Sequence, residues 1–286
     1  MIVGHASASA SLLAPIHLAT VLLGVAAVAA YRWATDPPAG VPRSRRSRVR
    51  LRCWQVAVVS LVVVELPPME QWVEASFAAH MVQHLVLVSV SAPLIVLARP
   101  GAALGAGLRR LGWPRGTVER AARRVRPLAS PVACWAAVVG YIWVVHFSAI
   151  YDLALDNAGI HLLEHLGFLV AAVLGWLPVL GPRHLTLPDP LKVLYVLVLM
   201  PALAFCGLAI FSADHVMFTS YAARPDALDD QRLGGMAMWI LPGAALLPLG
   251  LALVVRWWRR EEQAAARAEQ RVPPSVERGR LREASP

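Results

Sequence analysis

The chain has 286 residues, 57% of them hydrophobic and 16% charged, and its mean hydropathy is positive. A soluble domain of this length does not contain so many long uncharged runs, so the composition argues against a soluble enzyme and indicates a membrane protein. The formal net charge is +9, and almost all of the positive charge is arginine. A basic chain can bind nucleic acid. Here the arginines border the apolar runs, so we expect them to set membrane topology and expect no nucleic-acid partner.

Seven runs are predicted to be membrane spans, since about 20 apolar residues cross a bilayer as a helix. They lie near residues 12–31, 53–66, 75–98, 131–151, 158–180, 191–213 and 234–258. The second run is the shortest and is closed by Pro67 and Pro68. The predicted fold is an all-α, polytopic membrane helix bundle with seven transmembrane helices within residues 1–258. Residues 259–286 are expected to form a cytoplasmic, partly disordered tail.

The charges between the runs predict the orientation of the chain, because positive residues stay on the cytoplasmic side. Arginines crowd the segments 32–52 and 99–126, whereas acidic residues such as Glu65 and Asp152 follow the second and fourth runs. We therefore expect an N-terminus outside, a cytoplasmic C-terminus and a multi-pass protein of the bacterial plasma membrane. No basic segment precedes the first run, which favours an uncleaved helix over a signal peptide.

Histidines gather inside the apolar runs near the end predicted to face outward. His80 and His84 form one pair, His161 and His165 form another, and His146 lies close to the end of the fourth run. Two residues four apart on a helix point from the same face, as a metal site requires. At 1.5 Å per helical residue, all five lie at a similar depth, roughly 5–14 Å below the outer surface. A histidine in hydrocarbon is costly and usually functional, so we expect a shared site.

Copper suits these side chains, because imidazole binds it in both oxidation states and thioether sulfur prefers Cu(I). The five histidines are therefore the predicted metal ligands, and no catalytic residue is expected. Further candidates are His17, Met81, Glu164 and His215. Glu164 has two interpretations as a site residue: it orients an imidazole or binds as a hard ligand. The simpler alternative is that His17 and Met81 only fill space and that Glu164 is solvated.

The segment DALDDQRLGGMAMWILPG leads into the last run and carries two further signals. Gly234 and Gly235 are expected to permit close approach between helices. Asp229, Asp230 and Gln231 either cap the last helix or cover the site as a lid, and capping is the favoured interpretation.

Three segments resemble the multi-span, CtaG-type (caa3-type) cytochrome c oxidase assembly factors of bacteria. The matching stretches are AHMVQHLVLVSVSAPLIVLARP (79–100), HLLEHLGFLVAAVLGWLPVL (161–180) and DQRLGGMAMWILPG (230–243). The resemblance implies a plasma-membrane protein needed to build the haem–copper oxidase, with help in inserting copper into its catalytic subunit. The positions that match are His80, Met81, His84, His161, His165, Asp230 and Gln231.

The expected function is thus a non-enzymatic assembly factor that binds copper near the outer membrane face and assists its delivery to oxidase subunit I. The expected partners are the oxidase catalytic subunit, the lipid bilayer and, as a further candidate, a copper donor protein. Two alternatives stay open. One is a haem-binding membrane redox protein, although an i,i+4 pair on one helix cannot ligate one iron on both sides. The other is a zinc-dependent membrane hydrolase with Glu164 as base, although no HExxH motif is present.

Overall fold

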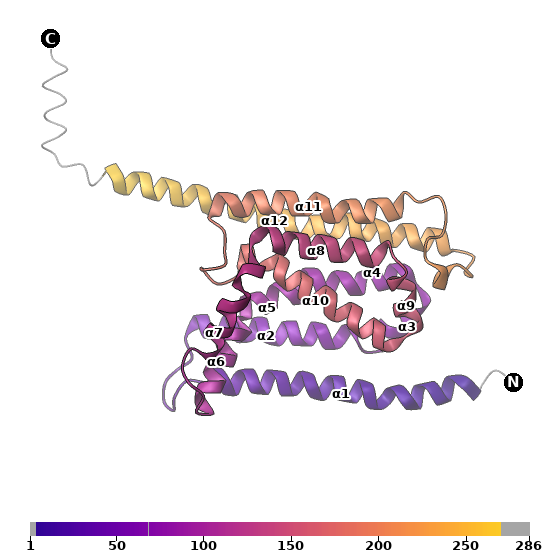
Figure 1. The fold of residues 1–286 in the computed structure, drawn as a ribbon, viewed down its shortest axis with the longest axis horizontal. Helices are drawn as coiled ribbons and strands as arrows, with labels where there is room; N and C mark the ends of the chain where they lie inside the picture. Colours follow the sequence, from indigo (N-terminus) through magenta and orange to yellow (C-terminus); the bar gives the residue numbers. More distant parts are fainter. Residues whose placement is uncertain (1–3, 68, 270–286) are drawn as a thin grey trace, which may run out of the picture.

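The computed structural model describes residues 4–67 and 69–269, and in these ranges the chain is helical without strands. This confirms the all-α prediction. Figure 1 shows the longer helices running side by side along one axis, as a bundle. In chain order the helices are α1 (Gly4–Thr35), α2 (Arg45–Val64), α3 (Met69–Ala75), α4 (Phe77–Val86), η1 (Leu87–Ser91), α5 (Ala92–Ala98), α6 (Pro100–Arg110), α7 (Thr117–Val125), η2 (Arg126–Ala129), α8 (Pro131–His146), α9 (Ile150–Asp156), α10 (Ala158–Leu180), α11 (Asp189–Phe211), η3 (Thr219–Tyr221) and α12 (Ala227–Glu269).

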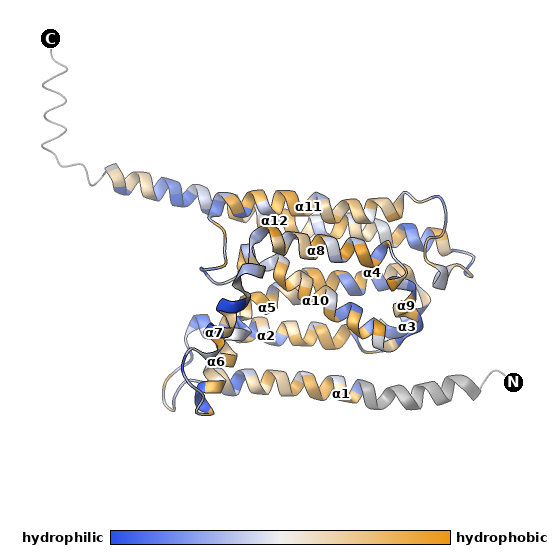
Figure 2. Cartoon of the chain, in the orientation of Figure 1, coloured by the Kyte–Doolittle hydropathy of each residue, from blue (hydrophilic) through white to orange (hydrophobic). Residues whose placement is uncertain are grey.

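Five helical segments are long and apolar enough to cross a membrane, and a sixth is added if the bent pair α8 and α9 counts as one span. The five are His17–Thr35 in α1, Phe77–Ala98 across α4, η1 and α5, then α10, α11 and Ala227–Ala268 in α12. The predicted span at 53–66 is not among them, because α2 begins with an arginine-rich stretch. Figure 2 shows hydrophobic residues along the bundle and hydrophilic residues gathered toward its two ends, the pattern expected of a protein that crosses a bilayer.

The ends of two predicted spans differ from the observed helices. The fourth was predicted to run through residue 151, but α8 ends at His146 and α9 leaves it at an angle of 68°. Ser148 lies in the break and its hydroxyl accepts the N–H of Ile150, which satisfies the start of the new helix. The last helix continues well beyond residue 258, to Glu269. The rest of the predicted tail, residues 270–286, lies outside the described part.

The third span contains a π-helical turn, η1, between α4 and α5. Pro93 follows this turn and has no N–H to donate to the carbonyls before it. One of those carbonyls, that of Val88, instead accepts the indole N–H of Trp176 from α10 at 2.9 Å. The irregular turn is therefore stabilised by a side chain from a neighbouring helix, as is required where backbone groups lie inside a membrane. It also ties α10 to the helix that carries His80 and His84.

Glycines bring α12 close to two neighbouring helices, which confirms the predicted close approach. A Cβ atom on Gly235 would lie 2.6 Å from the backbone nitrogen of Phe211 in α11. A Cβ atom on Gly234 would lie 2.5 Å from the ring of Phe77 and 3.1 Å from Met81, both in α4. Only glycine permits backbones to approach this closely. As a result, α12 packs directly against α4.

Candidate metal centre

Three helices bring five histidines together inside the bundle. His80 and His84 come from α4, His161 and His165 from α10, and His146 is the last residue of α8. The ring centroids of His80 and His161 lie 5.2 Å apart, as do those of His84 and His165. The two i,i+4 pairs therefore face each other across the contact between α4 and α10. All five rings are buried except that of His161, which is partly exposed.

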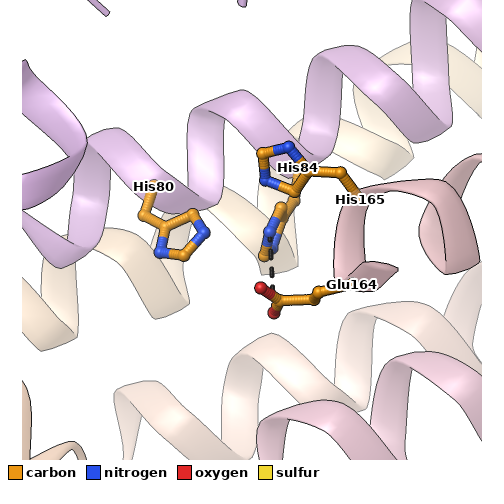
Figure 3. A group of neighbouring side chains, drawn as sticks. All are labelled: His80, His84, Glu164 and His165. Carbon is orange, nitrogen blue, oxygen red and sulfur yellow. Dashed lines mark ion pairs between the residues drawn. The ribbon is translucent and has the colours of Figure 1, made fainter. Parts of the chain in front are cut away.

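Four side chains point their ligand atoms into one common space. Figure 3 shows His80 and His84 turned toward Glu164 and His165, so that α4 and α10 each supply two groups. One nitrogen of each histidine and one carboxylate oxygen all lie within 4.8 Å of one another. All four residues are buried. Three imidazoles and one carboxylate form a donor set that binds copper or zinc.

Several of these atoms have no hydrogen-bond partner among the residues that the structure describes. They are both ring nitrogens of His84, Nε2 of His165 and both carboxylate oxygens of Glu164. Nε2 of His84 lies 3.8 Å from Glu164, which is too long for a hydrogen bond. A buried polar atom without a partner costs about 1–3 kcal/mol, and more if it is charged. Five such atoms in one place are what a bound cation would satisfy, so the residues fit a metal.

Glu65 orients His165 from the opposite side. Its carboxylate lies 2.7 Å from Nδ1 of His165, so Nδ1–H donates to it and Nε2 keeps its lone pair for the common space. Gln83 donates to the carbonyl of Val64 at 2.6 Å, which holds the end of α2 beside α4 and so places Glu65. From the sequence, Glu65 was predicted only to mark the topology of the chain. Its position at the end of an apolar run, at the level of the histidines, is the signal that could have identified it as a site residue.

Tyr151 is a second neighbour that the sequence analysis missed. It is the second residue of α9, and its hydroxyl lies 2.9 Å from Nδ1 of His80. Nε2 of His80 lies 3.3 Å from Nε2 of His161, the histidine at the partly exposed edge of the cluster. Tyr151 reaches His80 only because the chain bends after α8. No periodic pattern in the sequence predicts that bend.

A comparison with known protein families shows to which family the chain belongs. The family described as cytochrome c oxidase caa3 assembly factor (Caa3_CtaG) matches residues 19–260. The chain belongs to this family. The match covers most of the chain and confirms the resemblance predicted from the segments 79–100, 161–180 and 230–243.

The chain is also similar to proteins of three mycobacteria. Uncharacterized proteins of Mycobacterium bovis and Mycobacterium tuberculosis are each 25% identical over 240 residues, and one of Mycobacterium leprae is 23% identical over 242. Each comparison covers 77% of this chain and 36% of the relative. The chain therefore spans only about a third of the length of these relatives. No solved structure matches the chain.

The segment 230–243, which resembles the caa3 assembly factors, contributes no ligand but stabilises a helix that does. Asp230 of α12 accepts the hydroxyl of Ser76 at 2.7 Å and the N–H of Phe77 at 2.6 Å. Asp230 therefore caps the N-terminus of α4, the helix of His80 and His84. Gln231 accepts the N–H of Met217 at 2.7 Å and donates to the carbonyl of His215 at 3.1 Å. Asp230 was predicted to cap the start of its own helix. It does cap a helix, but that helix is α4 and not α12.

Two further candidate ligands, His17 and His215, lie apart from the group of His80, His84, Glu164 and His165. His17 pairs with Glu70 at 3.1 Å, because α1 packs on α2 and α6 at the edge of the bundle (Figure 1). His215 is exposed in the connection between α11 and α12, and its Nδ1 lies 2.8 Å from Asp214. Glu164, by contrast, lies inside the group and is buried, not solvated.

Proposed function

We propose that this member of the caa3 assembly factor family supports oxidase assembly by holding copper between α4 and α10 for delivery to the catalytic subunit. The ligands are His80, His84, Glu164 and His165, with His161 at the edge of the site. The observation that carries the proposal is a set of five buried nitrogen and oxygen atoms on His84, His165 and Glu164. None of them has a hydrogen-bond partner among the described residues. Groups of this kind are stable inside a membrane when they are paired with one another or with an ion.

The charge of the site suits a divalent ion. Glu164 and Glu65 supply two negative charges when ionised, and the three imidazoles are neutral when they act as ligands. Cu(II) balances these charges inside a medium that disfavours net charge. Zn(II) has the same charge and accepts the same ligands, so metal analysis must compare the two ions directly.

The site has a route for exchange on one side. The side chain of Glu65 is 33% exposed and His161 is partly exposed. The four proposed ligands, His80, His84, Glu164 and His165, are buried. A metal that enters or leaves therefore meets His161 and Glu65 first. This edge is where the oxidase subunit or a copper donor protein would receive or supply the ion.

The direct contacts between imidazoles argue against haem as the ligand. Nε2 of His80 and Nε2 of His161 lie 3.3 Å apart, and His84 packs on the ring of Phe168 with 4.2 Å between ring centroids. A macrocycle placed between these helices would have to separate both pairs. A small ion needs no such movement.

We place the site near the extracytoplasmic face. We also propose that α2 crosses the membrane, which brings the number of spans from six to seven. The arginine-bearing start of α2 lies with α6 and α7 at one end of the bundle, whereas α3 and α9 lie at the other (Figure 1). The histidines belong to this second end, because Tyr151 of α9 contacts His80. Basic residues stay in the cytoplasm, which puts the N-terminus and the metal site outside. Because α2 packs between α1 and α5, it has apolar neighbours along its length.

Metal analysis tests the proposal directly. The wild-type protein, purified in detergent and exposed to Cu(II) or Zn(II), is expected to retain an equimolar amount of copper after gel filtration. His84→Ala and His165→Ala are expected to lose it, and cells that carry them to assemble oxidase with less copper. His184→Ala is the matched control, since His184 is an exposed histidine in the loop before α11. Absence of copper in the wild type, or preferential retention of zinc, would refute copper handling at this site.

A further inference from the structure

One contact beside the four-residue group joins a histidine ring nitrogen to a methionine sulfur, which has no hydrogen to donate. Nε2 of His146 lies 3.3 Å from the sulfur of Met81. Met81 is completely buried and His146 nearly so. The thioether of methionine has lone pairs and no hydrogen. The contact is a hydrogen bond only if Nε2 carries a proton.

The other nitrogen of the same ring decides where the proton of a neutral imidazole lies. Nδ1 of His146 lies 2.7 Å from the carbonyl oxygen of Ile142, and a carbonyl only accepts. Nδ1 is therefore the donor, and Nε2 of the neutral ring presents a lone pair to the lone pairs of Met81. Two acceptors held face to face in a buried position need a positive partner: a metal ion, or the second proton of a charged imidazolium.

The surroundings keep Met81 in this position. Gly234 of α12 has no side chain, and a Cβ atom there would lie 3.1 Å from Cγ of Met81. His146 is fixed by its hydrogen bond one turn back in α8. The thioether sulfur is a soft ligand that prefers Cu(I), and the neutral imidazole nitrogen is a ligand that Cu(I) also accepts.

We infer that Met81 and His146 form a second metal site that takes Cu(I), distinct from the site of His80, His84, Glu164 and His165. The inference rests on the proposed function only in taking copper as the cargo. The two sites are neighbours, since the ring centroids of His84 and His146 lie 5.9 Å apart, with Phe168 against both rings. The first site has a carboxylate and suits a divalent ion, whereas the second has no charged ligand and suits a monovalent one.

The test uses Cu(I) alone, added without oxygen to the purified full-length protein, with X-ray absorption to detect sulfur bound to copper. A background variant, Glu164→Gln with His165→Ala, disables the first site. In this background we expect one bound Cu(I) per chain, with a sulfur neighbour. Adding Met81→Leu, which nearly conserves volume, is expected to abolish both the binding and the sulfur signal. Met238→Leu is the matched control, because Met238 is also buried but packs on Gly207.

Each outcome separates this inference from the proposed function. Failure of the background variant to bind Cu(I), or binding without a sulfur neighbour, overturns the second site. Loss of Cu(II) from otherwise wild-type protein on Met81→Leu alone also overturns it, because the two sets of ligands would then form one site. A wild-type protein that binds no Cu(II) but keeps the Cu(I)–sulfur signal refutes the proposed first site and supports the second.

Discussion

Glu65 and His165 are a hundred positions apart in the sequence, yet the carboxylate of Glu65 lies 2.7 Å from Nδ1 of His165. The pair has the arrangement in which a carboxylate fixes the tautomer of a metal-binding histidine. It links the end of α2, which carries no other candidate ligand, to the centre of the site. Its contribution is measurable separately from that of the ligands themselves.

Removal of this carboxylate is expected to weaken metal binding without abolishing it. Glu65→Ala is predicted to lower the affinity for Cu(II) by about 10–100-fold, the usual effect of losing such a partner. Glu65→Gln is expected to lose less, because the amide oxygen still accepts from Nδ1–H. Competition titration against a chelator measures both. Glu70→Ala is the control, since Glu70 contacts His17 at the edge of the bundle. Equal losses in Glu65→Ala and Glu70→Ala would contradict an orienting role.

Glu164 is expected to destabilise the metal-free protein and to stabilise the protein with copper bound. In the metal-free protein its carboxylate is buried without a hydrogen bond, which is unfavourable. Glu164→Gln should therefore leave the metal-free protein at least as stable as the wild type, as judged by thermal unfolding in detergent. Copper at 100 times its dissociation constant should stabilise the wild type by about 2.7 kcal/mol and the variant much less. A metal-free variant that is clearly less stable would show that Glu164 is paired in some other way.

The capping of α4 by Asp230 should be visible as stability. Asp230→Ala removes the acceptor for Ser76 and for the N–H of Phe77, and we expect a loss of about 1 kcal/mol. Asp229→Ala should have little effect, because the Asp229 side chain is 87% exposed. Chemical unfolding of the two variants in the same detergent gives the comparison. If both variants lose the same stability, the cap is not the cause.

The contact between α11 and α12 should tolerate no side chain at Gly235. In Gly235→Ala the added Cβ atom meets the backbone of Phe211 at 2.6 Å, and we expect a loss of about 1–3 kcal/mol from overpacking. Gly140→Ala in α8 is the control, since nothing lies within 4 Å of a Cβ atom there. The control should gain up to about 1 kcal/mol from helix propensity. If Gly235→Ala unfolds at the same temperature as the wild type, the close approach of α11 and α12 is contradicted.

The proposed seven-span topology predicts where a reporter on each end of the chain is active. A fluorescent protein that matures only in the cytoplasm should be bright when fused after residue 269. A reporter active only outside the cytoplasm should work when fused before the first helix. An odd number of spans places the two ends on opposite sides, whereas six spans would place both on the same side. Two ends on one side would therefore exclude α2 as a span.

Much of the architecture could be predicted from local patterns. The apolar runs located the long helices, and α10 occupies residues 158–180 as predicted. The spacing of four between His80 and His84, and between His161 and His165, predicted two rings on one face of each helix. These properties depend on the helical repeat, which is local in the sequence, so they did not require knowledge of the fold. The family match confirmed what the segments around these histidines indicated.

Only the tertiary structure decided which side chains meet. The contacts of Glu65 with His165, of Tyr151 with His80 and of Met81 with His146 each join separate helices. The contact of Glu65 depends on the hydrogen bond of Gln83 to the carbonyl of Val64. The other two depend on the bend after α8 and on the close approach of α12 to α4, because the direction in which a helix leaves its neighbour depends on packing. A helical repeat specifies the face on which a residue lies, but the partner of that face is set by contacts far apart in the chain.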